Sequence, residues 1–515
     1  MVTMGELVKE RAEIGGPWPS RGRREVALPL QNDVVRVIMG HPRKHVPCVQ
    51  LRRSQETDFE VTFQVGEEKL ETFEVRNGRS EEWLDVNLCG DIADVVILVQ
   101  VAKNKFELGR AAVLGSDFSA MQGVLRKTIL GGAGVVGELF IEFVVMTSLS
   151  AGVKAKVERG ISDIRPPRLA GHRGSGANGT APINENTILS FVAATRNSLV
   201  SHVELDVQLT REGTPVIYHD FHISAGRKHG KKGRGIPLYA LSIEEWSELD
   251  PPSLHDDASY YSDDDSPSLR SRTSAIAPFS QKGVNFKGSL HDGLPTLASV
   301  CKKCPSHVGM MIELKYPIPE FQEEMKLPYP SRDYFANRVL ETVFEEAKNA
   351  TRSIIFLTFD ATLAMILKAK QSRFPVYFLC AERDEDLTDQ LDYRSAALEH
   401  AIDYAENMHI NGNVFAAKVL LQKKHVVPIA KQKKLAVMTY GKINSDPATV
   451  QQQYECGVDG IIADNVNLLI TRMNRQHNED LQRSLQINNS SMDSDRNGED
   501  AGILSSAAQR LVGHV

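Results

Sequence analysis

The stretch from 169 to 220 constrains the fold of this chain more than any other part of the sequence. It contains three extended apolar runs, of which the first ends at His172 and the third at His219. The second run carries Glu204 and Asp206, which project to the same face because residues i and i+2 of a strand do so. Two such carboxylates are suited to share a hard cation. The ends of parallel strands are the usual place for catalytic groups in α/β barrels, so the stretch predicts a functional site.

The segment from about 167 to 475 alternates between extended and helical patterns, which predicts a parallel sheet or barrel. Eight extended runs can be counted, the number that a closed α/β barrel needs. Only a short polar turn separates Gln208 from Val216, so these two runs should pair as a hairpin. The predicted strands lie near 168–172, 202–207, 309–315, 353–358, 375–380, 407–411, 435–440 and 459–463.

Residues 26–149 have the pattern of a separate all-β domain. Apolar residues alternate strictly in 59–65 and in 84–88, which is typical of half-buried strands. Asn77-Gly78 is a strong signal for a hairpin turn. Further runs bring the count to about seven strands, which predicts an antiparallel sandwich. It shows no acidic loop cluster and no aromatic platform, so we interpret it as a packing or regulatory module with an unknown partner.

Four other segments have compositions that do not favour a packed core. Residues 1–25 are predicted to be a flexible lead-in, and 150–166 a linker between the two domains. The polar stretch at about 251–290 is predicted to be a disordered insertion on the catalytic face of the barrel, and 476–515 a disordered tail.

Composition excludes some classes of partner. The net charge of −6 does not favour a nucleic-acid-binding protein. The first residues are charged where a signal peptide would be apolar, and the apolar runs are too short to span a membrane. The six cysteines show no disulfide framework, and the lone Cys301-x-x-Cys304 pair has no partner pair at zinc spacing. We therefore expect a cytoplasmic chain without a transmembrane segment.

Several short motifs resemble those of the glycerophosphodiester phosphodiesterases. They are HRG, ENT, ELDVQLT, PVIYHD, LPTL, IELK and DGIIAD, and they occur in the family's order between Pro167 and Val466. The resemblance implies a TIM-type (β/α)8 barrel. It also implies an enzyme that hydrolyses a glycerophosphodiester, such as glycerophosphocholine, to sn-glycerol 3-phosphate and an alcohol.

The same resemblance implies roles for five of the residues. In the family, the carboxylates matching Glu204, Asp206 and Glu313 hold a divalent cation. An all-oxygen ligand set suits Mg²⁺, with Ca²⁺ or Mn²⁺ as alternatives, better than zinc. The histidines of the HRG and HD motifs serve as the acid–base pair, which here means His172 and His219. Which of them is the acid does not follow from the sequence.

Three further residues are candidates for substrate binding. Arg173 can offer a bidentate fork to a phosphate, and Lys315 a compact positive charge. Tyr440 occupies a position where the family commonly has Trp, so we expect it to line the glycerol or headgroup pocket. Another departure is the Leu-Val-Ser-His sequence at 199–202, where the family has Gly-Ala, and this should affect packing only.

Two alternatives to this function stay open at the level of sequence. The chain could be a catalytically silent relative that regulates phosphate signalling, or its substrate could be a lysophospholipid. Fungal members of the family carry a region like residues 26–149 behind regulatory segments, so the chain could be a shortened relative or a C-terminal portion. A dinucleotide fold is excluded despite a match at Gly174–Gly179, because Pro182 separates these glycines from the next helix.

Overall fold

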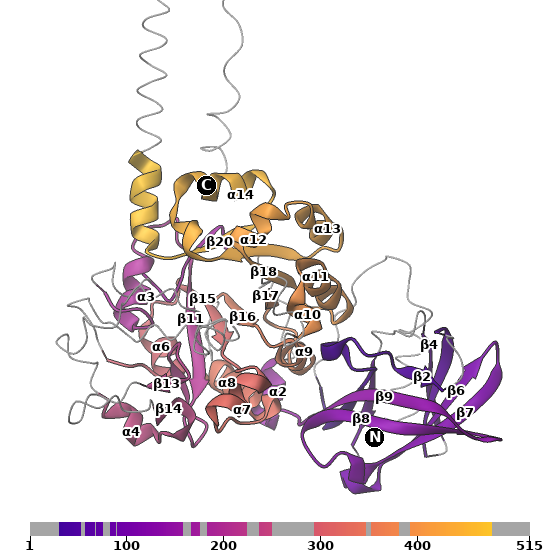
Figure 1. Cartoon of the computed structure of the whole chain (residues 1–515). Coiled ribbons are helices and arrows are strands. Elements are labelled where there is room, and N and C mark those ends of the chain that lie inside the picture. The colour runs from indigo at the N-terminus through magenta and orange to yellow at the C-terminus, as the bar shows by residue number, and fades with distance from the viewer. Residues whose placement is uncertain are drawn as a thin grey trace, which may run out of the picture. The chain divides into compact units, whose positions relative to one another are not determined.

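The eight parallel strands of the predicted barrel are present and form a closed ring (Figure 1). Their order is β10-β20-β19-β18-β17-β16-β15-β11, and pairing of β10 with β11 closes the ring. Most of these strands are apolar along their whole length because both of their faces are buried. The strands are β10 (Leu169–Gly171), β11 (His202–Leu209), β15 (Gly309–Leu314), β16 (Ile354–Thr358), β17 (Val376–Cys380), β18 (Gly412–Ala416), β19 (Ala436–Tyr440) and β20 (Gly460–Ala463).

The computed structural model describes most of the chain, and some of the sequence predictions fall outside the described residues. These residues are 30–52, 57–66, 68–75, 83–88, 90–157, 166–175, 183–223, 236–249, 293–346, 352–380 and 392–475. The lead-in at 1–25, the Asn77-Gly78 turn, the insertion at about 251–290 and the tail at 476–515 therefore lie outside them. Residues up to Val466 belong to one compact unit, and a second unit begins at Asn467.

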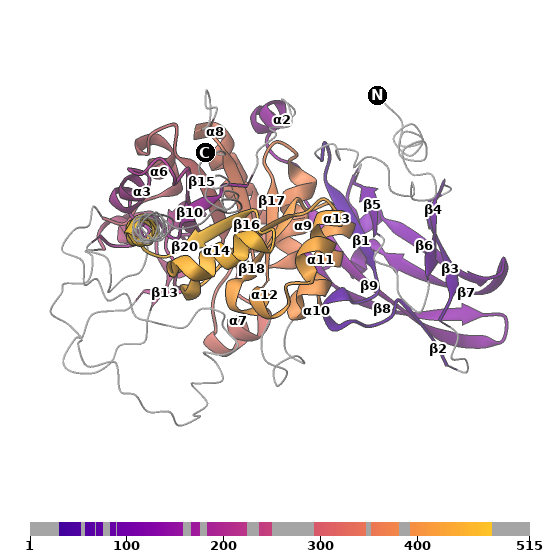
Figure 2. The same cartoon turned by 90° about the horizontal axis from the view of Figure 1, so that it is seen from above.

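Helices follow the barrel strands along the chain and surround them (Figures 1 and 2). Several begin at a side chain that accepts a hydrogen bond from the first turn, as Thr187, Thr296 and Asp360 do. The barrel helices are α3 (Ile188–Ala194), α6 (Leu297–Lys303), α8 (Arg332–Glu346), α9 (Ala361–Lys370), α11 (Leu398–Asn407), α12 (Ala417–Gln422), α13 (Val426–Gln432) and α14 (Pro447–Glu455).

Shorter elements complete the chain. The predicted linker contains α2 (Ala151–Val157), and the barrel loops contain α4 (Ile243–Ser247), α7 (Pro319–Met325) and α10 (Tyr393–Ala396). A two-stranded sheet pairs β13 (His222–Ile223) with β14 (Ile236–Pro237). The 3-10 turns are η1 (Pro42–Lys44), η2 (Ile92–Asp94), η3 (Gly115–Asp117), η4 (Leu238–Ala240) and η6 (Lys442–Ser445). In the part of the chain that the structure describes, no helix is both long and apolar enough to cross a bilayer.

The predicted hairpin is confirmed, whereas the position of the sixth barrel strand was wrong. β12 (Pro215–Ile217) pairs antiparallel with β11, with Gln208 opposite Val216. The sixth strand, β18, begins at Gly412, whereas the sequence pattern placed it at 407–411. Met408 and Ile410 alternate like strand residues, but they belong to the turn after α11, in which His409 has a left-handed backbone with φ of 54°.

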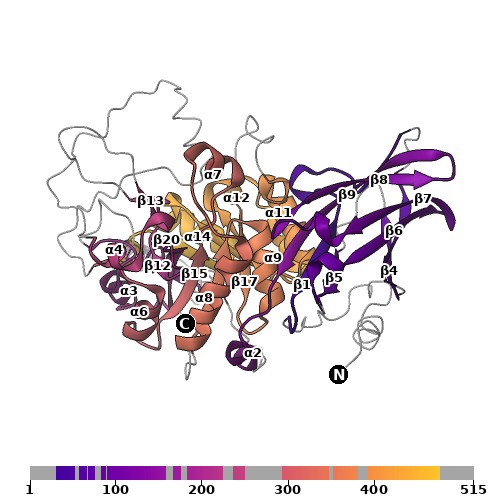
Figure 3. The same ribbon diagram turned by 90° about the horizontal axis from the view of Figure 1, so that it is seen from below.

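The N-terminal part of the chain is antiparallel β structure, as predicted (Figure 3). Its nine strands, which we call the β domain, form one continuous sheet with the order β4-β3-β6-β7-β8-β9-β1-β5, and β2 pairs with β9. The strands are β1 (Val34–Met39), β2 (Val49–Leu51), β3 (Phe59–Val65), β4 (Glu68–Val75), β5 (Trp83–Asn87), β6 (Val96–Lys103), β7 (Phe106–Leu114), β8 (Gln122–Gly131) and β9 (Gly134–Met146).

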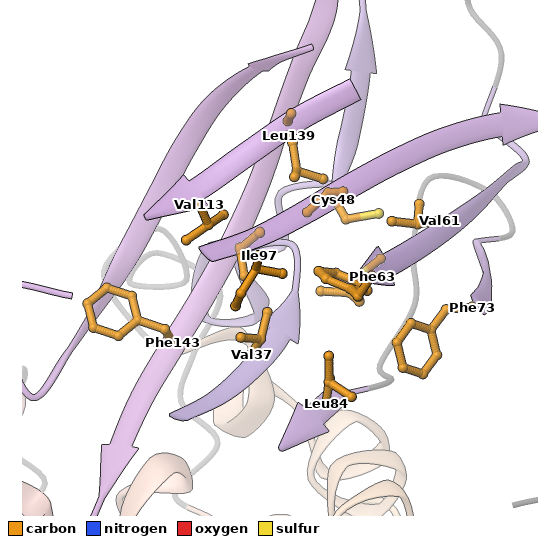
Figure 4. Close-up of a cluster of buried hydrophobic side chains, with 14 of the residues drawn as sticks. Val37, Cys48, Val61, Phe63, Phe73, Leu84, Ile97, Val113, Leu139 and Phe143 are labelled. Atoms are coloured by element: carbon orange, nitrogen blue, oxygen red, sulfur yellow. The ribbon is translucent and has the colours of Figure 1, made fainter. Parts of the chain in front are cut away.

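This single sheet encloses one hydrophobic core (Figure 4). Phe63, Phe73, Leu84 and Phe143, from four different strands, all belong to it. The pattern of alternation predicted about seven strands in two sheets, and the structure joins nine into one curved sheet. Strands β7 and β8 were missed because their outward positions also carry apolar residues, such as Phe106, which blurs the two-residue period.

Candidate active site

Three acidic side chains converge at the C-terminal ends of two neighbouring barrel strands. Glu204 and Asp206 share a face of β11, and Glu313 on β15 stands directly opposite Asp206 in the parallel ladder. Each residue offers a carboxylate oxygen, and these oxygens all lie within 4.8 Å of one another. All three residues are buried. The structure thus brings together the three predicted metal ligands, and we call them the carboxylate cluster.

The electrostatics of the carboxylate cluster favour a cation. Burial raises the pKa of Glu204, and the negative charge of Asp206 adds to this, so that its pKa is about 8. Burial also raises the pKa of Glu313, although Lys315 opposes the shift. Oε1 of Glu204 is buried without a hydrogen-bond partner. An orphaned oxygen among crowded carboxylates fits an oxygen-ligated divalent ion, so the residues present suit the predicted metal.

Two basic side chains flank the carboxylate cluster. Arg173 lies directly after His172 in a left-handed backbone conformation, with φ of 49°, and its N–H donates to Glu204 at 2.9 Å. Its Nε lies 3.3 Å from a carboxylate oxygen of Asp206. The Nζ of the fully buried Lys315 lies 3.1 Å from Glu313 and 3.5 Å from Asp206. The two predicted phosphate-binding residues therefore both lie beside Asp206, and their binding of phosphate stays a prediction.

The first predicted catalytic histidine is held by a carboxylate that the sequence analysis did not assign. Nδ1 of His172 hydrogen-bonds Asp464, which follows the last residue of β20, and Nε2 lies 3.8 Å from Glu204. Burial lowers the pKa of His172, but the charges of Asp464 and Glu204 outweigh it and raise the pKa to about 9. Asp464 closes the DGIIAD motif at a strand end, which is the signal that could have marked it.

The second predicted catalytic histidine has a similar partner. Nδ1 of His219 lies 2.7 Å from Oδ1 of Asp220, its neighbour in the sequence. Burial lowers the pKa of His219 well below its ordinary value, and the positive charges of Arg173 and Lys315 add to this. The chain after β12 is tied to β11, because the N–H of Tyr218 donates to the carbonyl of Asp206 at 2.9 Å. The hairpin therefore carries His219 to the end of β11 that bears the carboxylate cluster.

The ENT motif contributes two residues that the sequence analysis left without roles. Nδ2 of Asn186 donates to Asp206 at 2.8 Å from a left-handed backbone conformation, with φ of 57°. Glu185 accepts a hydrogen bond from Nη1 of Arg173 at 2.7 Å. The motif thus orients one member of the carboxylate cluster and one of its basic neighbours. Glu185 and Asn186 lie between a Pro-containing loop and a capped helix, and nothing in that local sequence indicates this role.

The last candidate, Tyr440, lies at the end of β19. Its ring packs edge-to-face against Phe359, which follows β16, with 5.7 Å between the ring centroids. Both side chains are partly buried and pack against the core of the barrel. The pair therefore forms an aromatic element at the same end of the barrel as the carboxylate cluster, and a substrate-binding role for Tyr440 stays a prediction.

The chain is similar to glycerophosphocholine phosphodiesterases of fungi. A glycerophosphocholine phosphodiesterase from Candida albicans is 29% identical over 347 residues, which cover 61% of this chain and 29% of that protein. One from Schizosaccharomyces pombe is 31% identical over 342 residues, which cover 61% of this chain and 29% of that protein. The chain thus spans less than a third of the length of these relatives.

A solved structure and a family model complete the comparison. The structure of an Oleispira antarctica phosphodiesterase in complex with sn-glycerol-3-phosphate is 18% identical, with a TM-score of 0.40, and covers 60% of this chain and 97% of that one. The model of the glycerophosphoryl diester phosphodiesterase family matches residues 172–468, which is more than half of the chain. This chain therefore belongs to the glycerophosphoryl diester phosphodiesterase family.

Proposed function

We propose that this protein hydrolyses glycerophosphodiesters of the glycerophosphocholine type to sn-glycerol 3-phosphate and a free alcohol. One observation carries the proposal: three buried carboxylates converge within 4.8 Å at the ends of β11 and β15. Two basic residues and two histidine–aspartate pairs surround them. The choice of substrate is supported by the names of the fungal relatives.

A phosphodiester resists hydrolysis because its negative charge repels nucleophiles and its leaving group is a poor one. Arg173 and Lys315 would bind the phosphoryl oxygens and stabilise the charge that develops on them. Because both are buried, the surrounding medium screens them less than water would. Asn186 and Glu185 would hold Asp206 and the Arg173 side chain in place while the substrate binds.

The two histidines would move protons. Each has its Nδ1 occupied by a carboxylate, Asp464 for His172 and Asp220 for His219, which fixes the orientation of the ring. Nε2 of each ring is then the atom that exchanges a proton with the substrate or with the attacking group. The family's chemistry would have the neighbouring glycerol hydroxyl attack first to give a cyclic phosphate, which water then opens.

Glu204, Asp206 and Glu313 would hold a divalent cation, which when bound supplies positive charge to the phosphoryl oxygens. Oxygen ligands favour Mg²⁺, with Ca²⁺ and Mn²⁺ as alternatives. All five cysteines among the described residues are free thiols, which supports a reducing compartment such as the cytoplasm.

Product analysis tests the proposal. The purified protein is incubated with glycerophosphocholine or lysophosphatidylcholine, with Mg²⁺, Mn²⁺ or Ca²⁺ or with EDTA, and free choline and glycerol 3-phosphate are measured. We expect release of choline from glycerophosphocholine with a divalent ion and none with EDTA. His219→Ala should lower the rate at least ~100-fold, the scale for losing an acid–base group. His222→Ala, at a neighbouring partly buried histidine, serves as the control.

Other outcomes would point to the open alternatives. Choline release only from lysophosphatidylcholine would favour a lysophospholipase D activity. No turnover of either substrate with any of the three ions would favour a catalytically silent regulator. A normal rate in His219→Ala would remove that residue from the proposed role.

A further inference from the structure

Helix α9 differs from the other barrel helices because it is buried on all sides. Nine of its ten residues are buried, whereas only five of the ten residues of α11 are. A barrel helix packs one face on the strands and normally leaves the other in water. The sequence of α9, ATLAMILKAK, is mostly apolar, which is typical of a helix covered on more than one side. Something other than the barrel sheet must therefore cover its outer face.

Strand β9 of the β domain carries a matching signal. Its residues alternate between buried and exposed at first, but the last six, Ile141–Met146, are all buried. Ile141, Phe143 and Val145 face the core of the β domain, so the residue after each of them points to the opposite face of the sheet. These are Glu142, Val144 and Met146, with exposures of 8%, 1% and 0%.

Thr147, which follows β9, contacts the C-terminal end of α9. Nζ of the buried Lys370 donates to the carbonyl of Thr147 and forms an ion pair of 2.6 Å with Asp333 on α8. Asp333 in turn accepts hydrogen bonds from the backbone N–H of Thr147 at 3.1 Å and from its hydroxyl at 2.5 Å. Lys370 and Asp333 of the barrel thus each have a hydrogen-bond partner in Thr147, outside the barrel.

Glu142 on β9 reaches the N-terminal end of the same helix. Its Oε1 lies 3.5 Å from the hydroxyl of Thr362 and 3.8 Å from Nη1 of Arg394. Arg394 also donates to the hydroxyl of Thr362 at 3.2 Å. Burial raises the pKa of Glu142, and the positive charge of Arg394 opposes this shift. Glu142 on β9 and Thr147 just after it therefore contact α9 at its two ends.

The N-terminal end of α9 leads directly to the candidate active site. Asp360, which caps the helix, forms two hydrogen bonds with Arg332, at 2.7 and 2.6 Å. The guanidinium of Arg332 stacks on Tyr316 at 4.3 Å, and Tyr316 follows Lys315 in the chain. On its other side Asp360 follows Phe359, whose ring packs on Tyr440. A displacement of this end of α9 would therefore also displace Tyr316, which follows Lys315, and Phe359, which packs on Tyr440.

We propose that the β domain is a fixed brace of the catalytic barrel, in which Glu142 on β9 and Thr147 just after it contact the two ends of α9, and Glu142 is a positioning residue for the loop after β16. The physical reason is that α9 is buried along almost its whole length, so contacts with the β domain help to keep it in place. The β domain is then a part of the catalytic machinery and does not act as a separate ligand-binding module.

Glu142→Ala in the full chain tests this proposal, with two readouts. We expect kcat to fall about 10-fold with KM changed less than about 2-fold, because the substrate still binds but the loop is displaced. Hydrogen exchange should become faster in the peptide that contains Leu363, whose N–H donates to the capping Asp360 at 2.7 Å. Glu142→Gln keeps an acceptor for Thr362 and should restore both readouts.

The matched control is Glu138→Ala. Glu138 lies on the same strand but pairs with the exposed Arg126, so both readouts should stay at the wild-type level. Thr362→Val removes the same contact from the barrel side, and it should lower kcat similarly without adding to Glu142→Ala in the double variant. If Glu142→Ala fails to fold, Thr362→Val still tests the proposal.

Three results would overturn the proposal. They are wild-type kcat with unchanged exchange at Leu363 in Glu142→Ala, an equal loss in Glu138→Ala, or failure of Glu142→Gln to restore either readout. The kcat readout rests on the proposed function, whereas hydrogen exchange does not. An inactive wild-type protein whose exchange still responds to Glu142→Ala would disprove the proposed function and support the brace.

Discussion

Two groups of largely buried charged side chains in the described part of the chain are built differently. In the carboxylate cluster, Glu204, Asp206 and Glu313 bring like charges within 4.8 Å of one another. The pKa of Glu204 rises because burial and the repulsion of Asp206 both disfavour its charged form. Such an arrangement costs folding free energy, which is typical of functional sites.

The second group, which we call the junction cluster, lies where the β domain meets the barrel. It consists of Glu142, Arg332, Asp360, Asp392 and Arg394. Here each arginine meets an aspartate with both donors of its fork, and the distances are 2.6–2.8 Å. The two arginines are matched in this way, whereas Oε2 of Glu142 is buried without a hydrogen-bond partner and burial raises the pKa of Glu142. The comparison teaches that buried charge alone does not point to a cation site, whereas three carboxylates gathered within reach of one ion do.

The largest effect should come from breaking the junction cluster. Arg332→Met would leave the partly buried carboxylate of Asp360 without its cation, which should lower the free energy of unfolding by about 3 kcal/mol. Urea denaturation followed by circular dichroism measures the change. Lys302→Met, in the more exposed ion pair with Glu346, should change it by less than about 1 kcal/mol. Equal effects in the two variants would mean that burial of the Arg332 pair contributes nothing.

The carboxylate cluster should respond in the opposite way. Glu204→Gln removes one of the crowded charges while keeping an acceptor for the N–H of Arg173. We expect activity to fall at least ~100-fold, equivalent to about 2.7 kcal/mol, with the free energy of unfolding unchanged or higher. Initial rates of choline release and urea denaturation measure the two quantities. A loss of stability as large as that of Arg332→Met would show that the two clusters do not differ.

A third expected effect is a dependence of stability on pH. In protein kept in EDTA, folded Glu204 has a pKa of about 8 against an ordinary value of 4.5. Between these values the folded state holds a proton that the unfolded state has lost. The free energy of unfolding should therefore fall as pH rises from about 4.5 to about 8. Urea denaturation across this window should show a shallower fall for Glu204→Gln, and an identical fall would contradict the assignment.

Much of the candidate site could be predicted because the positions of its residues follow from the local geometry of the strands. Glu204 and Asp206 share a strand face at i and i+2, and that relation needs no knowledge of the fold. The eight-strand count placed Glu313 beside them, because the ends of neighbouring parallel strands meet at the same edge. His219 followed from a turn that is too short for a crossover helix.

Other features depended on partners far away in the chain. Asp464 meets His172 across 292 positions of sequence, and nothing local to either residue specifies that contact. The single β sheet in place of two depended on which strand edges pair, which periodicity does not encode. The sixth strand was misplaced because a turn with alternating apolar residues has the same local pattern as a strand.

The sequence by itself indicated the family, the barrel and the candidate site residues, because strand-end positions and two-residue spacing are properties of the local backbone. Only the tertiary structure decided which charges remote in the chain meet. Glu142 and Glu204 are both buried glutamates, yet one lies beside Arg394 and the other beside Glu313 of the neighbouring strand. Electrostatic energy depends on distances between residues remote in the chain, and these distances are set only when the domains pack.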